Sequence, residues 1–204
     1  MISDDFKYET ESLALNWQWN HNPDNRLWSV TERPGNLRLK TGHITNHVLQ
    51  APNTLTQRTE GPKCNGIVSV NLTNMKNGDY AGLIALQSNF GTVGVGQKEN
   101  GDRYVRMTMN NGEGQEQIVE EQPCPENHLF LKIHFDFEES VDLASFYYAI
   151  DGNDWVKIGE KLQMKYTLDH FMGYRIGLFN YATQEPGGYV DFDYFQYERG
   201  SQVK

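Results

Sequence analysis

The sequence predicts an all-β sandwich built as a single domain from 204 residues. Apolar and polar side chains alternate with a period of two over many segments, as in strands that bury one face. Turn residues recur about every ten positions between these segments. No segment has a convincing period of 3.6 residues, which a helix packed on a core would show. These observations together favour two packed antiparallel sheets.

The expected strands follow one another without an internal linker or repeat. Residues 128–139 are the clearest, because Leu129, Leu131 and Ile133 alternate with polar side chains. Residues 145–150 and 156–159 should form a hairpin, since the Asp-Gly pair at 151–152 suits its turn. The other strands are expected at residues 35–42, 53–59, 78–88, 90–97, 102–110, 174–182 and 188–198. One short helical turn is possible within residues 160–171.

Charge and hydropathy exclude two classes of partner. The formal net charge is −9, with 18 Lys and Arg against 27 Asp and Glu. Nucleic-acid binding depends on clustered Lys and Arg, and the sequence has no basic stripe. No segment is long and apolar enough to span a membrane, and the N-terminus lacks a signal-peptide pattern. The compartment stays open between the bacterial cytoplasm and secretion as part of a larger enzyme.

Cys64 and Cys124 are the two cysteines. Two cysteines in a chain of this length are no disulfide framework. They could pair in an exported protein, or they could both remain free thiols, and the sequence leaves both alternatives open.

No motif in the sequence assigns a catalytic residue or requires a cofactor. The G-x-S-x-G nucleophile motif and the H-E-x-x-H zinc motif are both absent. Two carboxylate pairs, Asp191 with Asp193 and Asp136 with Glu138, have strand spacing and would lie roughly 7 Å apart, as in inverting glycosidases. Any such pair on a strand passes this test, so it carries little weight.

A structural calcium ion is possible at Asp191 and Asp193, which alternate on one strand near the C-terminus. Asp4 and Asp5 could add oxygen ligands, because terminal strands often pair in sandwiches. The alternative is a set of solvated carboxylates at a strand edge.

Three of the 4 tryptophans, Trp17, Trp19 and Trp28, lie close together in the sequence. Trp17 and Trp19 share one face of an expected strand, and adjacent tryptophans on one face favour the core. The amide side chains between them would then face outward. Trp28 lies in the following loop without clear alternation, so we expect it to be exposed. A sugar-binding platform formed by all three is the alternative.

The segment LNWQWNHNPDNRLWSVTERPGNLRLKTG, residues 15–42, resembles the start of the C-terminal β-sandwich that follows the five-bladed propeller of family 43 glycoside hydrolases. The resemblance continues in the same order and extends from about Asp4 to Tyr197. The further matching segments are NTLTQRTEGP, MKNGDYAGLIALQ, GTVGV, YYAIDGNDWVKIG and GYRIGLFNYATQEPGGYVDFDYF.

This resemblance implies a concanavalin A-like, jelly-roll sandwich of two antiparallel sheets. The family's enzymes are β-xylosidases and α-arabinofuranosidases whose catalytic carboxylates belong to the propeller, so it implies no catalytic residue here. In those enzymes the sandwich packs against the propeller and can help to shape the active-site pocket. Similar domains are also classed as carbohydrate-binding modules directed at xylan.

On such a sandwich, the concave sheet and the loops at its rim offer a groove for a sugar. Aromatic rings cover the apolar faces of sugars, while amide, guanidinium and carboxylate groups bind their hydroxyls. For each candidate, ordinary packing within the sheet is the alternative. The candidate ligand-binding residues are Asn20, His21, Asn22, Asp24 and Trp28 in the first loop, and Gln57, Arg58, Gln87, Asn180, Tyr181 and Tyr189 further along.

The leading functional hypothesis is a non-catalytic module that binds xylan or xylo-oligosaccharides and targets or completes a family 43 glycoside hydrolase. The second is an accessory domain that packs on the catalytic propeller and binds no sugar by itself. The third is an independent enzyme, for which we expect no turnover of aryl xyloside or arabinofuranoside substrates.

Overall fold

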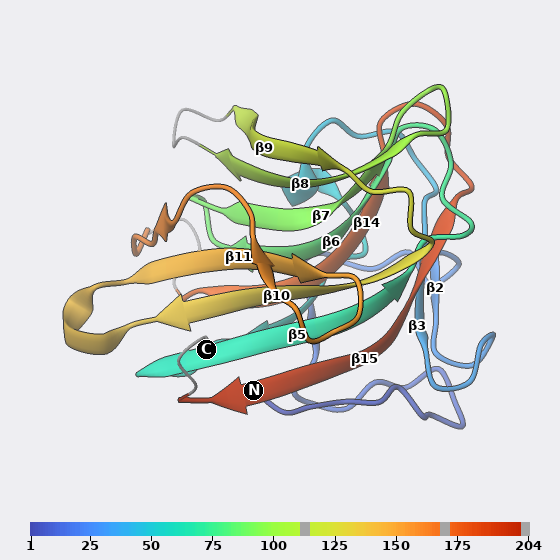
Figure 1. The fold of residues 1–204 in the computed structure, drawn as a ribbon. Coiled ribbons are helices and arrows are strands. Elements are labelled where there is room, and N and C mark those ends of the chain that lie inside the picture. Colours follow the sequence, from blue (N-terminus) through green and yellow to red (C-terminus); the bar gives the residue numbers. More distant parts are fainter. Residues whose placement is uncertain (111–114, 168–171, 201–204) are drawn as a thin grey trace.

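The structure is a computed structural model, and it describes residues 1–110, 115–167 and 172–200. Its strands form two antiparallel sheets packed face to face, which confirms the predicted sandwich (Figure 1). The helical elements within these ranges are single 3-10 turns, η1 (Val48–Gln50) and η2 (Glu138–Ser140). None of the helices described is long and apolar enough to cross a membrane.

The first sheet has seven strands, and β1, β4 and β14 form the end of it that concerns the candidate site. Every pairing along it is antiparallel. In spatial order the strands are β1 (Gln18–Trp19), β4 (Leu55–Arg58), β14 (Arg175–Ala182), β6 (Asp79–Leu86), β7 (Gly91–Gln97), β8 (Arg103–Asn110) and β9 (Glu116–Pro123).

The second sheet has eight strands, including the predicted hairpin, formed by β11 and β12. Short β13 (Leu162–Gln163) pairs with β11 where a helical turn was considered possible, and residues 168–171 of that segment lie outside the described residues. Apart from β13, the strands of this sheet in spatial order are β12 (Val156–Lys157), β11 (Leu143–Ala149), β10 (His128–Asp136), β5 (Lys63–Asn71), β15 (Tyr189–Arg199), β3 (Leu37–Lys40) and β2 (Trp28–Ser29).

Strand β10 shows how alternation builds the core between the sheets. Leu129, Leu131 and Ile133 are fully buried, as the period of two predicts. Lys132, expected on the solvated face, is also buried, because its ammonium group lies 4.0 Å from the ring centroid of Trp155. This cation–π contact occupies one face of Trp155, which is half-buried at the sheet surface.

Strand β5 lies between β10 and β15 and was not predicted. Its residues Asn65, Gly66 and Ser69 are typical of turns, yet they are buried in the middle of the sheet. Gly66 is required by packing, since a Cβ there would lie 2.2 Å from Ile176 of the opposite sheet. Strand β9 was also missed, because its polar side chains hide the period of two.

A second hydrophobic cluster covers part of the seven-stranded sheet's outer face. Along β6, Tyr80, Ile84 and Leu86 point outward and alternate with the core residues. Val48 and Ala51, at and after η1, pack on them together with Tyr181. The middle of this sheet is therefore buried on both faces and offers no open sugar-binding groove there.

The N-terminal segment is fixed by one carboxylate. Asp4 pairs with Phe195 of β15, which confirms that the two ends of the chain lie side by side. Its oxygens accept hydrogen bonds from Trp17 Nε1 at 2.7 Å, from the Phe6 amide at 2.8 Å and from the Tyr8 hydroxyl. Trp17 is buried against Phe6 and Phe195, so its predicted place in the core is confirmed.

Cys64 and Cys124 are both buried free thiols. Burial raises the pKa of each to about 11, so neither is a reactive thiolate at neutral pH. Of the two alternatives from the sequence, the structure has the free thiols.

We expect Asp4→Asn to destabilise the protein by about 2 kcal/mol, because an amide nitrogen cannot accept the hydrogen bonds of Trp17 and Tyr8. Asp5→Asn is the matched control, since Asp5 is exposed and pairs only with exposed Lys7. Thermal unfolding of both variants is the measurement. Equal melting temperatures for the two would contradict the assigned role of Asp4.

Candidate functional site

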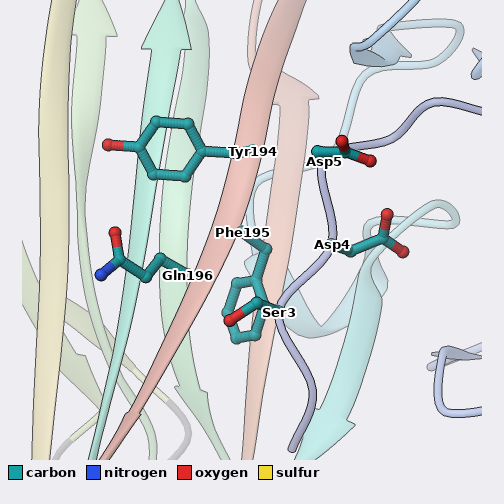
Figure 2. A pocket seen from close by; sticks show the side chains of 6 residues that line it. All are labelled: Ser3, Asp4, Asp5, Tyr194, Phe195 and Gln196. Carbon is teal, nitrogen blue, oxygen red and sulfur yellow. The ribbon is translucent and has the colours of Figure 1, made fainter.

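One pocket lies between the N-terminal segment and β15, but its polar groups do not converge. It encloses about 440 Å³. Figure 2 shows Tyr194 and Gln196 projecting from β15, while the carboxylates of Asp4 and Asp5 point away from them. The Asp4 oxygens are also occupied by the hydrogen bonds that fix the segment. This pocket is therefore a poor ligand site.

A larger pocket, of about 650 Å³, lies at the β1 end of the seven-stranded sheet. We call it the Trp19 pocket. It combines one indole ring with several hydrogen-bonding groups, the composition that sugar recognition uses. Its lining residues are Gln18, Trp19, Asn20, His21, Leu49, Met172 and Arg175.

Pairing of β1 with β4 places the indole at this edge. Trp19 lies opposite Leu55, and the backbone N–H of Asn20 donates to the Thr54 carbonyl at 2.9 Å. The Trp19 ring packs on Trp28, with ring centroids 5.1 Å apart. Trp28 is itself partly buried and donates through Nε1 to Asn25. Trp28 therefore supports Trp19 from behind, and neither tryptophan is wholly core or wholly exposed, contrary to the split expected from the sequence.

Asn20 and His21 supply polar groups to the pocket. His21 Nε2 lies 2.6 Å from the Leu49 carbonyl oxygen, which can only accept a hydrogen bond. His21 must therefore carry its proton on Nε2. The Asn20 amide nitrogen, 3.3 Å from the same Nε2, cannot also donate to it. The donors of Asn20 thus remain available to a ligand.

Arg175 forms a buried basic part of the wall. Only 8% of the residue is exposed, its Nη1 donates to Thr56 at 3.2 Å, and its Nε has no partner. Arg58 lies directly opposite on β4. Burial, and then the charge of Arg58, lower the pKa of the Arg175 guanidinium. Among the described residues, no carboxylate forms an ion pair with this cationic edge of the site.

Arg58 lines a second pocket of about 430 Å³, which we call the Arg58 pocket. Met172 lines both pockets, so the two adjoin. A ligand longer than one sugar ring could extend from one to the other. The residues of the Arg58 pocket are Arg58, Thr59, Gly61, Phe137, Met172, Gly173 and Tyr174.

The structure brings Asn20, His21 and Arg58 together but removes four candidates, because they are buried and serve the fold. The Gln57 amide bonds both backbone groups of Ile2, and Gln87 donates to the Met172 carbonyl at 2.6 Å. Asn180 donates to the Leu39 carbonyl in the opposite sheet, and Tyr181 lies in the outer hydrophobic cluster. The alternative of ordinary packing therefore holds for these four.

The remaining candidates do not line either pocket. Asn22 is exposed in the loop after β1. The carboxylate of Asp24 is bound by the Arg26 side chain at 3.0 and 2.7 Å, which lowers its pKa to about 2. Tyr189 belongs to the eight-stranded sheet, where Arg38 stacks on its ring.

The proposed calcium ligands do not fit a cation. Asp191 is 2% exposed, and its oxygens accept hydrogen bonds from Arg38 at 2.7 and 3.0 Å and from Arg33 at 2.9 Å. Two guanidinium groups therefore already neutralise it. Asp193 is exposed beside an irregularity in the β15 register. The described residues contain no group of three His, Cys, Asp or Glu that could hold a metal ion.

The residues that sequence reasoning missed come from three separate segments. Leu49 lies in the 3-10 turn η1 and Met172 in the irregular chain before β14, so no strand pattern marks either residue. Arg175 does have a signal, since it is a charged residue beginning an otherwise apolar buried strand.

A family model described as the β-xylosidase C-terminal concanavalin A-like domain matches residues 3–198. A β-xylosidase of Formosa agariphila is 29% identical over 218 residues, covering 95% of this chain and 35% of the relative. The chain thus spans about a third of the length of this curated relative.

Solved structures show the same fold. A bifunctional GH43-CE protein of Bacteroides eggerthii is 48% identical, with a TM-score of 0.94, over 98% of this chain and 26% of its own. A GH43 enzyme engineered for endo-xylanase and exo-arabinofuranosidase activity is 28% identical, with a TM-score of 0.87, over 97% of this chain and 40% of its own.

We expect excess EDTA to leave the melting temperature unchanged, and added CaCl₂ to leave it unchanged as well, because Asp191 is already neutralised by Arg33 and Arg38. Differential scanning calorimetry of chelated and calcium-loaded protein provides the check. A rise in melting temperature that follows calcium concentration would show a cation site after all.

Proposed function

This chain belongs to the family of β-xylosidase C-terminal concanavalin A-like domains, and on that premise we propose that it binds xylan or xylo-oligosaccharides at the Trp19 pocket. Its relatives are family 43 glycoside hydrolases. The 204 residues contain the C-terminal sandwich domain and not the catalytic propeller, so they are not catalytic by themselves. The proposed role is therefore to hold substrate for a catalytic domain in the same enzyme.

The observation that carries this proposal is the combination of groups around the Trp19 pocket. A pyranose ring presents a flat face of C–H groups bordered by hydroxyls. The half-buried indole of Trp19 suits that face, and Asn20 and Gln18 supply amide donors and acceptors for the hydroxyls. The pocket offers one indole ring for stacking, which supports micromolar to millimolar affinity.

A second candidate is packing on the catalytic propeller without sugar binding. The apolar side chains of Leu49, Met172 and Phe137 in the two adjoining pockets favour it, since they would also suit a protein surface. The two candidates differ in what the isolated domain does. A sugar-binding module binds oligosaccharides alone, whereas a packing domain ignores them and associates with the catalytic domain.

Titration of the 204-residue protein with xylotetraose tests the proposal. We expect measurable heat, and Trp19→Ala should weaken binding about tenfold because the stacking ring is lost. Trp28→Ala should have a smaller effect, since Trp28 only supports Trp19. Trp155→Ala is the matched control and should bind like the parent protein, because Trp155 lies beside β12 at the far edge of the other sheet.

Absence of heat at millimolar xylotetraose would overturn sugar binding and leave packing on the propeller as the function. Equal losses in Trp19→Ala and Trp155→Ala would place the sugar elsewhere on the domain.

A further inference from the structure

Two arginines stand side by side at the candidate site, and no acidic side chain among the described residues is paired with them. Arg58 and Arg175 face each other across β4 and β14, and like charges directly opposite in a sheet destabilise it. In the part of the chain that the structure describes, no Asp or Glu forms an ion pair with either arginine. The chain does not lack carboxylates, since its 27 acidic residues outnumber its 18 basic ones.

Several other cations in the protein are paired with acidic side chains. Arg33 and Arg38 share the carboxylate of Asp191, and Lys63 reaches Glu138. In each case an acidic side chain lies close enough to neutralise the cation. The arginine pair departs from this pattern although Arg175 lies on a buried strand, where an uncompensated charge costs more than at the surface.

Burial makes an unpaired charge costly at Arg175 in particular. Only 8% of the Arg175 residue is exposed, and its Nε is out of contact with water and has no hydrogen-bond partner. A guanidinium has five N–H donors. The one hydrogen bond described for it, to Thr56 at 3.2 Å, leaves the group largely unsatisfied. A guanidinium positioned by packing and left with free donors in a pocket wall is prepared for an anion.

We propose that Arg175 and Arg58 bind the carboxylate of a uronic acid carried as a side group by a xylo-oligosaccharide. Guanidinium and carboxylate groups match each other in plane and can form two parallel hydrogen bonds. The neutral backbone of the ligand lies against Trp19, and the acidic side group reaches the arginines beside Met172, where the two pockets adjoin. This proposal rests on the proposed function and names the substrate class of the same site.

The test compares two probes of equal backbone length, xylotetraose and xylotetraose bearing one glucuronic acid, by titration calorimetry. We expect the acidic probe to bind about fivefold more tightly, or better, at low salt. This advantage should shrink at physiological salt, because ions screen the partly exposed Arg58.

Arg58→Gln is the informative variant, since Arg58 is exposed and its loss does not open the core. It should remove most of the preference for the acidic probe, so that the two probes bind this variant with nearly equal affinity. Arg26→Gln is the control, because Arg26 is also an exposed arginine, pairs with Asp24 and lines neither pocket. It should retain the full preference.

Each other outcome overturns the proposal in a distinguishable way. Equal affinity for the two probes refutes acidic-sugar recognition and leaves xylan binding intact. Binding of neither probe refutes both the xylan-binding function and this inference. If Arg58→Gln leaves both sugars unaffected but weakens association with the catalytic domain of the related Bacteroides eggerthii protein, the carboxylate belongs to a protein and the proposal is wrong.

Discussion

The candidate site depends on the hydrogen bonds that the Asp4 carboxylate accepts. The first seventeen residues contain no strand, yet they pass the eight-stranded sheet and lead the chain to β1 in the other one. By accepting hydrogen bonds from Tyr8 and Trp17, Asp4 closes this segment on itself immediately before β1. Trp17 is thereby fixed in the core, and Trp19 follows at the edge of β4 as the ring of the pocket.

Packing on the outer face of the seven-stranded sheet decides which surface is left open to a ligand. Val48 and Ala51 fill the outer face of the seven-stranded sheet over β6, so the middle of that sheet is closed. The open surface lies beyond this cluster, where β1 and β4 end the sheet and Leu49 turns toward the pocket. Arg175 stands at the boundary, on a strand buried along its whole length, and its guanidinium gives this edge its chemical character.

The sequence predicted the sandwich well because alternation is a local property of strands with one wet face, as in β10. It failed for β5, whose small polar residues are buried on both faces by neighbouring strands, and for the site residues Gln57, Gln87 and Asn180. At these positions, alternation predicts which face of the strand a side chain lies on, but not which distant segment covers it in the folded protein. The N-terminal residues over Gln57 and the opposite sheet beside Asn180 are distant in sequence. Asn20, His21 and Arg58 remain candidates because they line the two pockets.

The outermost strands of the two sheets have a consequence for how molecules of this protein meet one another. β1, β2, β12 and β13 have two residues each, too few to pair stably with a strand of another molecule. Among the outermost strands of the described residues, β9 is the long one, with eight residues, and it carries Glu116, Glu120 and Glu121, of which Glu121 is paired with Lys98. Two such edges repel each other, and Pro123 removes a backbone donor at the end. These edges thus disfavour the extension of either sheet by a strand of another molecule.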